Sequence, residues 1–539
     1  MKENFIKALY VWELTALIIP NVLLGLARGD GFALFVCGTF LPAALYALLL
    51  SLGRRTPLAT ILLFPAAFLG AFQLVLLSLN GSTVIAADMF LNVVTTNPGE
   101  AFEVLDNLIP AVSGVVMLYL PPLIMAVMAL RKHSRLPLNF QKSARVAAFG
   151  FMAAGAAALP FAKGYCLPES QFPLDACHNF YLAVDREVKT ARYAESSADF
   201  SFEACSARPD SVPQIYILVI GETSRADNWQ LGGYGRATNP RLSSVEGLHY
   251  FPRAASQSNT THKSVPMLMS DIDALCFDSV YFRKGIAEAF NEAGYTTEFI
   301  SNQRPNRSFI DFFGKQAGKW CFIKEEDGRE HFDGDMLPMV REFVERPEKS
   351  LFIILHTYGS HFDYSMRYPS EFSIFRPDGP IKAEASSRDV LINAYDNTIV
   401  YTDYFLAELI DLLQASGRDA ALVYTSDHGE DIFDDDDRHF LHASPVPTGR
   451  QLRVPMLIWT SKSYMEHHPE IIECLEENKD KKISTSSSVF HTLINMAGIC
   501  TPRLIEEKSA ASGKFAEDGG LYLNDHNEAV DASPYLKGR

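Results

Sequence analysis

The chain has 539 residues and a formal net charge of -16 at pH 7. This length exceeds what one hydrophobic core usually holds, so we expect at least two domains. The acidic balance argues against nucleic acid as a partner, because nucleic acid recruits basic surfaces.

Five apolar stretches near the N-terminus have the length of membrane-spanning helices. About 20 apolar residues cross a bilayer core, and no small-residue cleavage site marks the first stretch as a removable signal peptide. We therefore expect residues 1–162 to form a five-helix transmembrane domain with a long external loop over residues 80–107. The predicted spans are residues 6–27, 32–52, 57–79, 109–130 and 146–162.

The short loops between these spans differ in their content of Lys and Arg, which accumulate on the cytoplasmic side. The short loops on one side of the membrane contain a single basic residue, Arg28. This asymmetry predicts a cytoplasmic N-terminus and an external C-terminal part. In a bacterium, that is a multi-pass inner-membrane protein with a periplasmic domain. The basic residues of the other side are Lys2, Lys7, Arg54, Arg55, Arg131, Lys132, Arg135, Lys142 and Arg145.

The external loop carries Asn92, Thr96 and Glu100 at the i, i+4, i+8 spacing of one helix face. They are candidates for binding a lipid headgroup, and the alternative is the polar face of a surface helix. Pro98 argues against one continuous helix through this loop, because proline lacks the backbone N–H that a helix interior needs. Residues 163–212 are interpreted as a juxtamembrane linker, in which residues 180–194 are amphipathic enough to lie along a membrane surface.

Residues 213–539 have the pattern of a soluble α/β domain. Strand-length apolar runs alternate with helical patterns, which predicts a mostly parallel sheet covered by helices on both faces. In such sheets ligands bind beyond the carboxyl ends of the strands. The predicted strands are residues 215–220, 296–301, 351–355, 420–425 and 454–459, and the predicted helices are residues 280–293, 336–345 and 390–416.

Reactive side chains follow two of these strands. Glu222 follows the first strand and Asp427-His428 follows the fourth. With a hydroxyl oxygen they could complete a four-ligand site for zinc or manganese, although either motif alone could be a cap or an ion-pair partner. Thr261 begins a helical segment, where the helix dipole and a metal would lower its pKa; the alternative is an N-cap threonine.

Seven of the eight cysteines lie in the part predicted to be exported, where oxidising conditions favour disulfides. One to three bridges are expected, and Cys166 and Cys177 enclose the shortest loop. The seven are Cys166, Cys177, Cys205, Cys276, Cys321, Cys474 and Cys500.

Five motifs follow one another along the chain: Gly221-Glu222-Thr223-Ser224-Arg225, residues 232–240, Thr261 with Ser264-Val265-Pro266, Gly359-Ser360-His361, and Ser426-Asp427-His428-Gly429-Glu430 with Leu441-His442. In this order they resemble the motifs of the bacterial phosphoethanolamine transferases, inner-membrane enzymes of the alkaline phosphatase and sulfatase superfamily. That family has five membrane helices and a periplasmic catalytic domain. The resemblance implies that Thr261 is the nucleophile and that Glu222, Thr261, Asp427 and His428 hold zinc. His361 and His442 match histidines that contact the phosphoryl group or a further zinc.

The same resemblance implies transfer of phosphoethanolamine from phosphatidylethanolamine, through a covalent Thr261 intermediate, to lipid A or another lipopolysaccharide or envelope glycan. We expect a monomer. Gln257 and Met267 stand where the family commonly has a cysteine pair, and Gln303 and Arg307 are the counterparts of headgroup-binding residues in relatives of the lipid A type.

Two alternatives stay open. One is a phosphoglycerol transferase or sulfatase of the same superfamily, although a sulfatase needs Cys or Ser where Thr261 stands. The other is a non-catalytic membrane protein that binds envelope lipids, although the intact set of ligand residues weighs against it.

Overall fold

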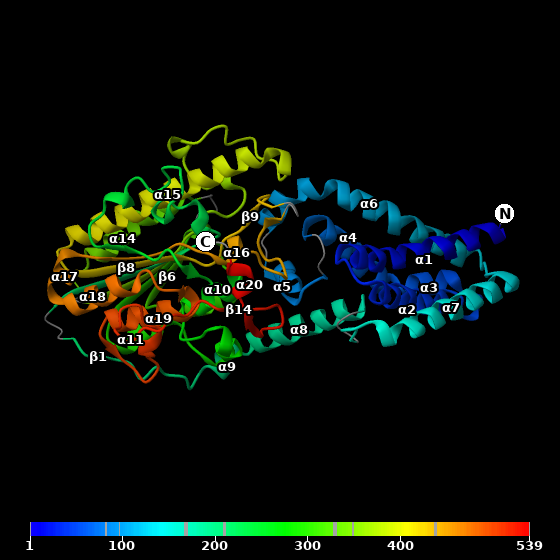
Figure 1. Ribbon diagram of the computed structural model, residues 1–539, viewed down its shortest axis with the longest axis horizontal. Coiled ribbons are helices and arrows are strands. Elements are labelled where there is room, and N and C mark those ends of the chain that lie inside the picture. The colour runs from blue at the N-terminus through cyan, green and yellow to red at the C-terminus, as the bar shows by residue number, and fades with distance from the viewer. Residues whose placement is uncertain are drawn as a thin grey trace. The chain divides into compact units, whose positions relative to one another are not determined.

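The computed structural model describes residues 2–80, 84–95, 98–166, 171–208, 212–326, 331–347, 350–435 and 439–537. The chain divides into two compact units (Figure 1). The first consists of Met1–Val94 and Gly99–Arg186, and Glu187–Arg539 makes up most of the second. The division after Arg186 falls inside the stretch 163–212 that we interpret as a linker.

The first unit is helical. Four of its described helical stretches are long and apolar enough to cross a membrane, namely Glu3–Ala27, Phe32–Leu50, Ile109–Arg131 and Leu138–Phe161. The count becomes five if the bent pair α3 and α4 is one span. The helices are α1 (Lys2–Ala27), α2 (Phe32–Leu50), α3 (Thr56–Leu62), α4 (Phe64–Asn80), α5 (Ala87–Thr95), α6 (Pro98–Arg131) and α7 (Leu138–Ala158).

The predicted single span over residues 57–79 is instead broken between α3 and α4, with a bend of 58°. Pro65 explains the break, because proline has no N–H and its ring collides with the carbonyl four residues earlier, that of Ile61. Elsewhere the helices pack closely: a Cβ on Gly155 of α7 would lie 2.6 Å from the Leu41 side chain of α2. Small residues at such contacts let membrane helices approach.

The predicted external loop contains helix. Asn92 lies in α5 and Glu100 in α6, so these two candidates belong to separate helices, as Pro98 indicates. Thr96 lies outside the described residues, as do the side chains of Asn92 and Glu100. Their proposed contact with a lipid headgroup therefore stays a prediction.

The helix α8 (Leu174–Ala191) forms much of the predicted linker. Phe180, Val184 and Val188 are about half exposed along it and share one face at i, i+4, i+8 spacing. This is the amphipathic helix that the sequence indicates for residues 180–194. Its position on a membrane surface stays a prediction.

The second unit is built on a seven-stranded sheet with the order β3-β11-β8-β2-β7-β5-β6. The pairs from β8 to β6 are parallel, whereas β11 is antiparallel to both β8 and β3. The prediction of a mostly parallel sheet is confirmed. The strands are β2 (Gln214–Gly221), β3 (Leu248–Tyr250), β5 (Thr296–Ser301), β6 (Lys319–Phe322), β7 (Ser350–His356), β8 (Asp419–Ser426) and β11 (Met456–Thr460).

Helices lie on both sides of this sheet: α14 (Leu337–Val344) and α15 (Arg388–Ala415) on one, and α11 (Ile286–Glu292) and α19 (Thr485–Met496) on the other (Figure 1). Alternate β2 residues such as Tyr216 and Leu218 join the core on the α19 side. The predicted helix over residues 280–293 begins only at Ile286. A 3-10 helix ends at Phe282, and Gly285 with extended backbone separates the two.

Shorter elements complete the second unit. Two-stranded pairs join β1 (Cys205–Ser206) to β13 (Ile499–Cys500), β4 (Ala254–Ala255) to β12 (Ile483–Ser484), β9 (Asp431–Ile432) to β10 (Phe440–Leu441), and β14 (Leu521–Leu523) to β15 (Ala529–Asp531). The remaining helices are α9 (Tyr193–Ser196), α10 (Thr261–Leu268), α12 (Phe309–Gly314), α13 (Ile323–Glu326), α16 (Gly449–Leu452), α17 (Lys462–His467), α18 (Pro469–Asn478) and α20 (Ser533–Leu536).

Candidate active site

The carboxyl ends of β2 and β8 bring Glu222 and Asp427-His428 together. The strands are parallel neighbours with Gly221 opposite Ser426, so the residue after each strand emerges at the same edge. One potential ligand atom from each of Glu222, Asp427 and His428 lies within 4.8 Å of the others, and all three residues are buried. The sequence-based expectation of a carboxylate and imidazole cluster at this edge agrees with the geometry.

Thr261 adds a hydroxyl group to this cluster. It is the first residue of α10, so its side chain lies at the positive end of a helix dipole. Its Oγ1 lies 3.3 Å from Glu222 Oε1 and 3.1 Å from His428 Nε2. The structure thus brings together all four residues that the sequence nominates as metal ligands.

The hydrogen bonds around His428 leave its Nε2 as an acceptor. Its Nδ1 lies 2.9 Å from the carbonyl oxygen of Gly429, which assigns the ring hydrogen to Nδ1. Burial lowers the pKa of His428 to about 4, so the ring is neutral at pH 7. Nε2 is then a free lone pair, which is the form that binds a metal.

Acceptor atoms face one another across this cluster. Nε2 of His428 lies 3.2 Å from Oδ2 of Asp427, and this buried oxygen has no hydrogen-bond partner among the described residues. The other oxygen, Oδ1, accepts from the backbone N–H groups of Thr223 and His428. Burial raises the pKa of the Asp427 carboxyl to about 7, because its charged form has no positive partner among the described residues. A bound cation would supply that partner, so the residues present fit one.

Gln303 lies against the cluster. Its Nε2 donates to Glu222 Oε2 at 3.1 Å and to the carbonyl oxygen of Thr357 at 2.9 Å. The sequence nominates it for substrate binding, and the structure adds a contact that orients a potential ligand. Arg307, the other residue predicted to bind substrate, is exposed. Its side chain makes no hydrogen bond or ion pair with the described residues, and its backbone N–H donates to Asp311.

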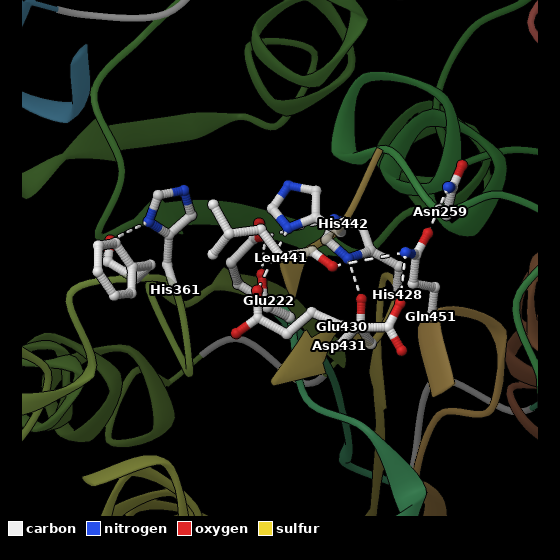
Figure 2. A network of polar contacts seen from close by, with 12 residues as sticks. Glu222, Asn259, His361, His428, Glu430, Asp431, Leu441, His442 and Gln451 are labelled. Atoms are coloured by element: carbon white, nitrogen blue, oxygen red, sulfur yellow. Dashed lines mark hydrogen bonds and ion pairs between the residues drawn. The ribbon is translucent and has the colours of Figure 1, made fainter. Parts of the chain in front are cut away.

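His361 and His442 form a row of imidazoles with His428 (Figure 2). The ring centroids of His442 and His428 are 4.2 Å apart, and those of His442 and His361 are 6.3 Å apart. Burial is the main cause that lowers the pKa of both His361 and His442, so both rings are neutral at pH 7. Neutral imidazoles can contact a phosphoryl oxygen through N–H or bind a metal through N.

Glu430 is a further buried group that supports this row. The hydroxyl of Tyr364 donates to its Oε1, and its Oε2 lies 3.5 Å from His442 Nδ1 (Figure 2). In the sequence, Glu430 stands in the Asp427 motif, and the motif by itself indicates no role for it. Its place three residues after Asp427 is the signal that could have suggested one.

Asn259 connects the segment before Thr261 with the segment of His442, and sequence reasoning missed it. Its Nδ2 donates to the carbonyl oxygen of Ser444 at 2.8 Å and to Gln451 Oε1 at 2.6 Å (Figure 2). Its Oδ1 accepts from the Tyr522 hydroxyl of the C-terminal hairpin at 3.0 Å. No local pattern marks this asparagine, because its partners lie 185 to 263 residues away.

Backbone geometry around Glu222 requires particular residues. Gly359 has a φ of +47°, and a Cβ there would lie 2.7 Å from the carbonyl oxygen of Glu222. Thr223 has a φ of 60°, which is unusual for a β-branched residue, and the Tyr395 hydroxyl donates to its carbonyl oxygen at 2.7 Å. Such strained positions cluster at functional sites.

Curated proteins with similar sequences include the phosphoethanolamine transferase EptA of Salmonella typhimurium, which is 32% identical over 296 residues, 53% of this chain and 53% of that protein. The Kdo(2)-lipid A phosphoethanolamine 7''-transferase of Escherichia coli is 28% identical over 343 residues, 59% of this chain and 57% of that protein. The match therefore spans about half the length of these relatives.

Solved structures share the fold. The integral membrane protein lipooligosaccharide phosphoethanolamine transferase A of Neisseria meningitidis matches with a TM-score of 0.71 and 23% identity, over 94% of this chain and 98% of that chain. The C-terminal periplasmic domain of Escherichia coli EptC, in complex with Zn, matches with a TM-score of 0.56 and 24% identity, over 62% of this chain and 97% of that chain.

A sequence model of the sulfatase family matches residues 214–499. This range covers more than half of the chain and includes the whole cluster of Glu222, Thr261, Asp427 and His428. The chain therefore belongs to the sulfatase family.

Proposed function

We propose that this protein is a phosphoethanolamine transferase. The donor is phosphatidylethanolamine, and the acceptor is lipid A or another lipopolysaccharide or envelope glycan. The observation that carries the proposal is the approach of the Thr261 hydroxyl to Glu222 and His428 within 3.3 Å. The curated relatives named above, which carry this activity in their names, support the choice of transferred group.

Four residues would hold a divalent metal: Glu222, Thr261, Asp427 and His428. The mixed set of two carboxylates, one imidazole and one hydroxyl suits zinc, the metal in the EptC domain complex, better than manganese. Such an ion supplies Lewis acidity, which lowers the pKa of a bound hydroxyl and neutralises charge on a phosphoryl oxygen.

Thr261 acts as the nucleophile in the first half of the reaction. Its Oγ1 forms a bond to the phosphorus of the donor, and the bond between phosphorus and the diacylglycerol oxygen breaks. The hydroxyl hydrogen of Thr261 has two acceptors within reach, Glu222 Oε1 at 3.3 Å and His428 Nε2 at 3.1 Å, and the proton taken up passes to the diacylglycerol oxygen as it leaves. In the second half, an acceptor oxygen attacks the same phosphorus and Thr261 is released.

His361 and His442 contact the transferring group. Both rings are neutral at pH 7 and line the side of the cluster next to His428. Nδ1 of His361 donates to the carbonyl oxygen of Phe362 and Nδ1 of His442 faces Glu430 Oε2, so each neutral ring leaves Nε2 as a lone pair, which suits a further zinc. A ring that has taken up a proton would donate to a phosphoryl oxygen, where charge accumulates in the transition state. Arg307 and the residues Asn92, Thr96 and Glu100 remain candidates for binding the headgroups of donor and acceptor, and Gln303 acts there through its contact with Glu222.

The protein is proposed to sit in the inner membrane as a monomer with a cytoplasmic N-terminus. The transmembrane domain comprises residues 1–162, the linker 163–212 and the periplasmic catalytic domain 213–539. The apolar helices of the first unit and the asymmetry of Lys and Arg between its loops support this topology.

Mass spectrometry of the full-length protein, purified from cells that contain phosphatidylethanolamine, tests the nucleophile. We expect a phosphoethanolamine adduct on Thr261 that disappears in Thr261→Ala and persists in the matched control Thr260→Ala, the residue just before α10. An active protein without an adduct would refute the covalent intermediate.

Incubation with headgroup-labelled phosphatidylethanolamine and phosphatidylglycerol tests the donor. Label transferred to lipid A from the ethanolamine lipid alone supports the proposal. Label from the glycerol lipid alone would favour a phosphoglycerol transferase, and transfer from neither lipid, by protein that contains zinc, would favour a lipid-binding role.

A further inference from the structure

Cys205 and Cys500 lie directly opposite each other across the antiparallel pair β1 and β13. Cys205 precedes the first strand of the large sheet, and Cys500 follows the last helix of the core, α19. Both residues are exposed free thiols. Cys177, which with Cys166 encloses the shortest loop in the sequence, is also a free thiol.

Contacts on both sides of the cysteines set this register. The backbone N–H of Ala207 donates to the carbonyl oxygen of Gly498 at 2.9 Å, and the Thr501 hydroxyl donates to the carbonyl oxygen of Phe202. Since the side-chain period of a strand is two, a slip by one residue would turn the two cysteines to opposite faces. The flanking bonds exclude such a slip.

The segment before Cys205 is anchored in the core. Phe202 is fully buried and stacks on Phe490 of α19, with ring centroids 5.4 Å apart. The backbone N–H groups of Phe202 and Ala204 donate to the carboxylate of Glu292 at 3.0 and 2.9 Å. Cys205 is therefore held beside Cys500 by the fold itself, which gives the two thiols a high effective concentration.

The backbone geometry suits a disulfide. Cys205 and Cys500 are register partners in this antiparallel pair. Residues directly opposite each other in an antiparallel pair have Cα atoms about 4.5 to 5.5 Å apart, with side chains on one face. Disulfides join Cα atoms about 4.4 to 6.8 Å apart.

We propose that Cys205 and Cys500 are joined by a disulfide in the exported protein. The two thiols lose two protons and two electrons to the disulfide of a thiol–disulfide oxidoreductase, which leaves as a dithiol. The exposure of both thiols allows such a partner to reach them. The bond closes a loop that contains the whole family-matched range 214–499, so it joins the two ends of that range.

Peptide mapping tests the bond directly. The full-length protein is alkylated during extraction from membranes without reductant, digested and analysed by mass spectrometry. We expect a cross-linked pair of peptides that contain Cys205 and Cys500. Recovery of both cysteines as alkylated thiols, or of either in a bond to another cysteine, would overturn the proposal.

Thermal unfolding tests whether the bond between Cys205 and Cys500 stabilises the domain. Cys205→Ser, Cys500→Ser and the double variant are expected to unfold at the same temperature, about 5 °C below the wild type. Reductant should lower the unfolding temperature of the wild type to that of the variants and leave the unfolding temperatures of the three variants unchanged. Cys474→Ser, the matched control, should behave like the wild type. If reductant lowered the unfolding temperature of the double variant as much as that of the wild type, the stabilising role of this disulfide would be contradicted. The proposal rests on the periplasmic location proposed above but not on the transfer reaction, and neither assay measures transfer activity, so the failure of one is distinguishable from the failure of the other.

Discussion

Replacing Asn259 by alanine tests whether the network behind Thr261 positions the nucleophile. The substitution removes three side-chain hydrogen bonds, to Ser444, Gln451 and Tyr522, from a residue that is 2% exposed. The backbone bond from the N–H of Ala443 to the carbonyl oxygen of Asn259 remains. The change therefore loosens the segment before α10 without removing any atom from Glu222, Thr261, Asp427 or His428.

The expected loss of stability follows from these contacts. A net buried hydrogen bond contributes about 1 kcal/mol, and an acceptor left unpaired costs about 1 to 3 kcal/mol. The Ser444 hydroxyl has one hydrogen, which faces the carbonyl oxygen of Val446 at 2.7 Å and Gln451 Oε1 at 3.0 Å. Both Gln451 Oε1 and the Ser444 carbonyl oxygen therefore lose a donor when Asn259 is replaced. We expect Asn259→Ala to lower the free energy of unfolding by about 3 kcal/mol, and Tyr522→Phe by about 1 kcal/mol.

The expected loss of activity follows from the position of Asn259, two residues before Thr261. Displacing a catalytic group by about 1 Å costs on the order of a hundredfold in rate. We expect kcat of Asn259→Ala to fall about 10- to 100-fold at 25 °C, with KM for the lipid donor nearly unchanged.

Urea unfolding and turnover of labelled phosphatidylethanolamine, normalised to folded protein, measure both effects. The control is Asn495→Ala in α19, which removes one partly buried side-chain hydrogen bond, to the Ser509 hydroxyl. An Asn259→Ala protein that loses stability but keeps the kcat of the wild type would refute a positioning role for this network.

Three further predictions concern other parts of the second unit. Burial lowers the pKa of His491 to about 4, and its Nδ1 accepts from the N–H of Ile505. The stability that comes from keeping this ring neutral is complete above about pH 6.5 and is lost as the pH falls towards 4. Between pH 7 and 5, the free energy of unfolding of the wild type in urea titrations should therefore fall by about 2 kcal/mol more than that of His491→Asn. Parallel pH profiles of the two proteins would exclude this histidine as the cause. Gln303→Ala removes the bond to Glu222 and should weaken zinc binding about 10-fold in competition with a chelator, and an affinity within twofold of the wild type would contradict an orienting role. Gly359→Ala adds a Cβ 2.7 Å from the Glu222 carbonyl oxygen at a positive φ, so it should cost about 1 to 3 kcal/mol and lower the zinc content; a variant with full zinc would show that Glu222 tolerates the shift.

Local patterns in the sequence were sufficient to predict the framework of this protein. Hydrophobic run lengths predicted the strands β2, β5, β7, β8 and β11, because strand-length apolar runs bounded by polar residues report burial directly. The rule that parallel strands present their carboxyl ends at one edge then placed Glu222 beside Asp427 and His428. Pro65 shows where reading apolar length alone fails, since it breaks the third apolar stretch into α3 and α4.

Only the tertiary structure decided which distant residues meet. Asn259 contacts Tyr522 across 263 residues, Gln303 turns towards Glu222, and Cys205 comes to lie opposite Cys500. None of these contacts has a local signal, because each depends on how β-pairs and loops from separate parts of the chain pack around the sheet. The sequence by itself determined which chemical groups stand at the strand ends, and packing determined their distances, partners and protonation, since burial and neighbouring donors are properties of the assembled core.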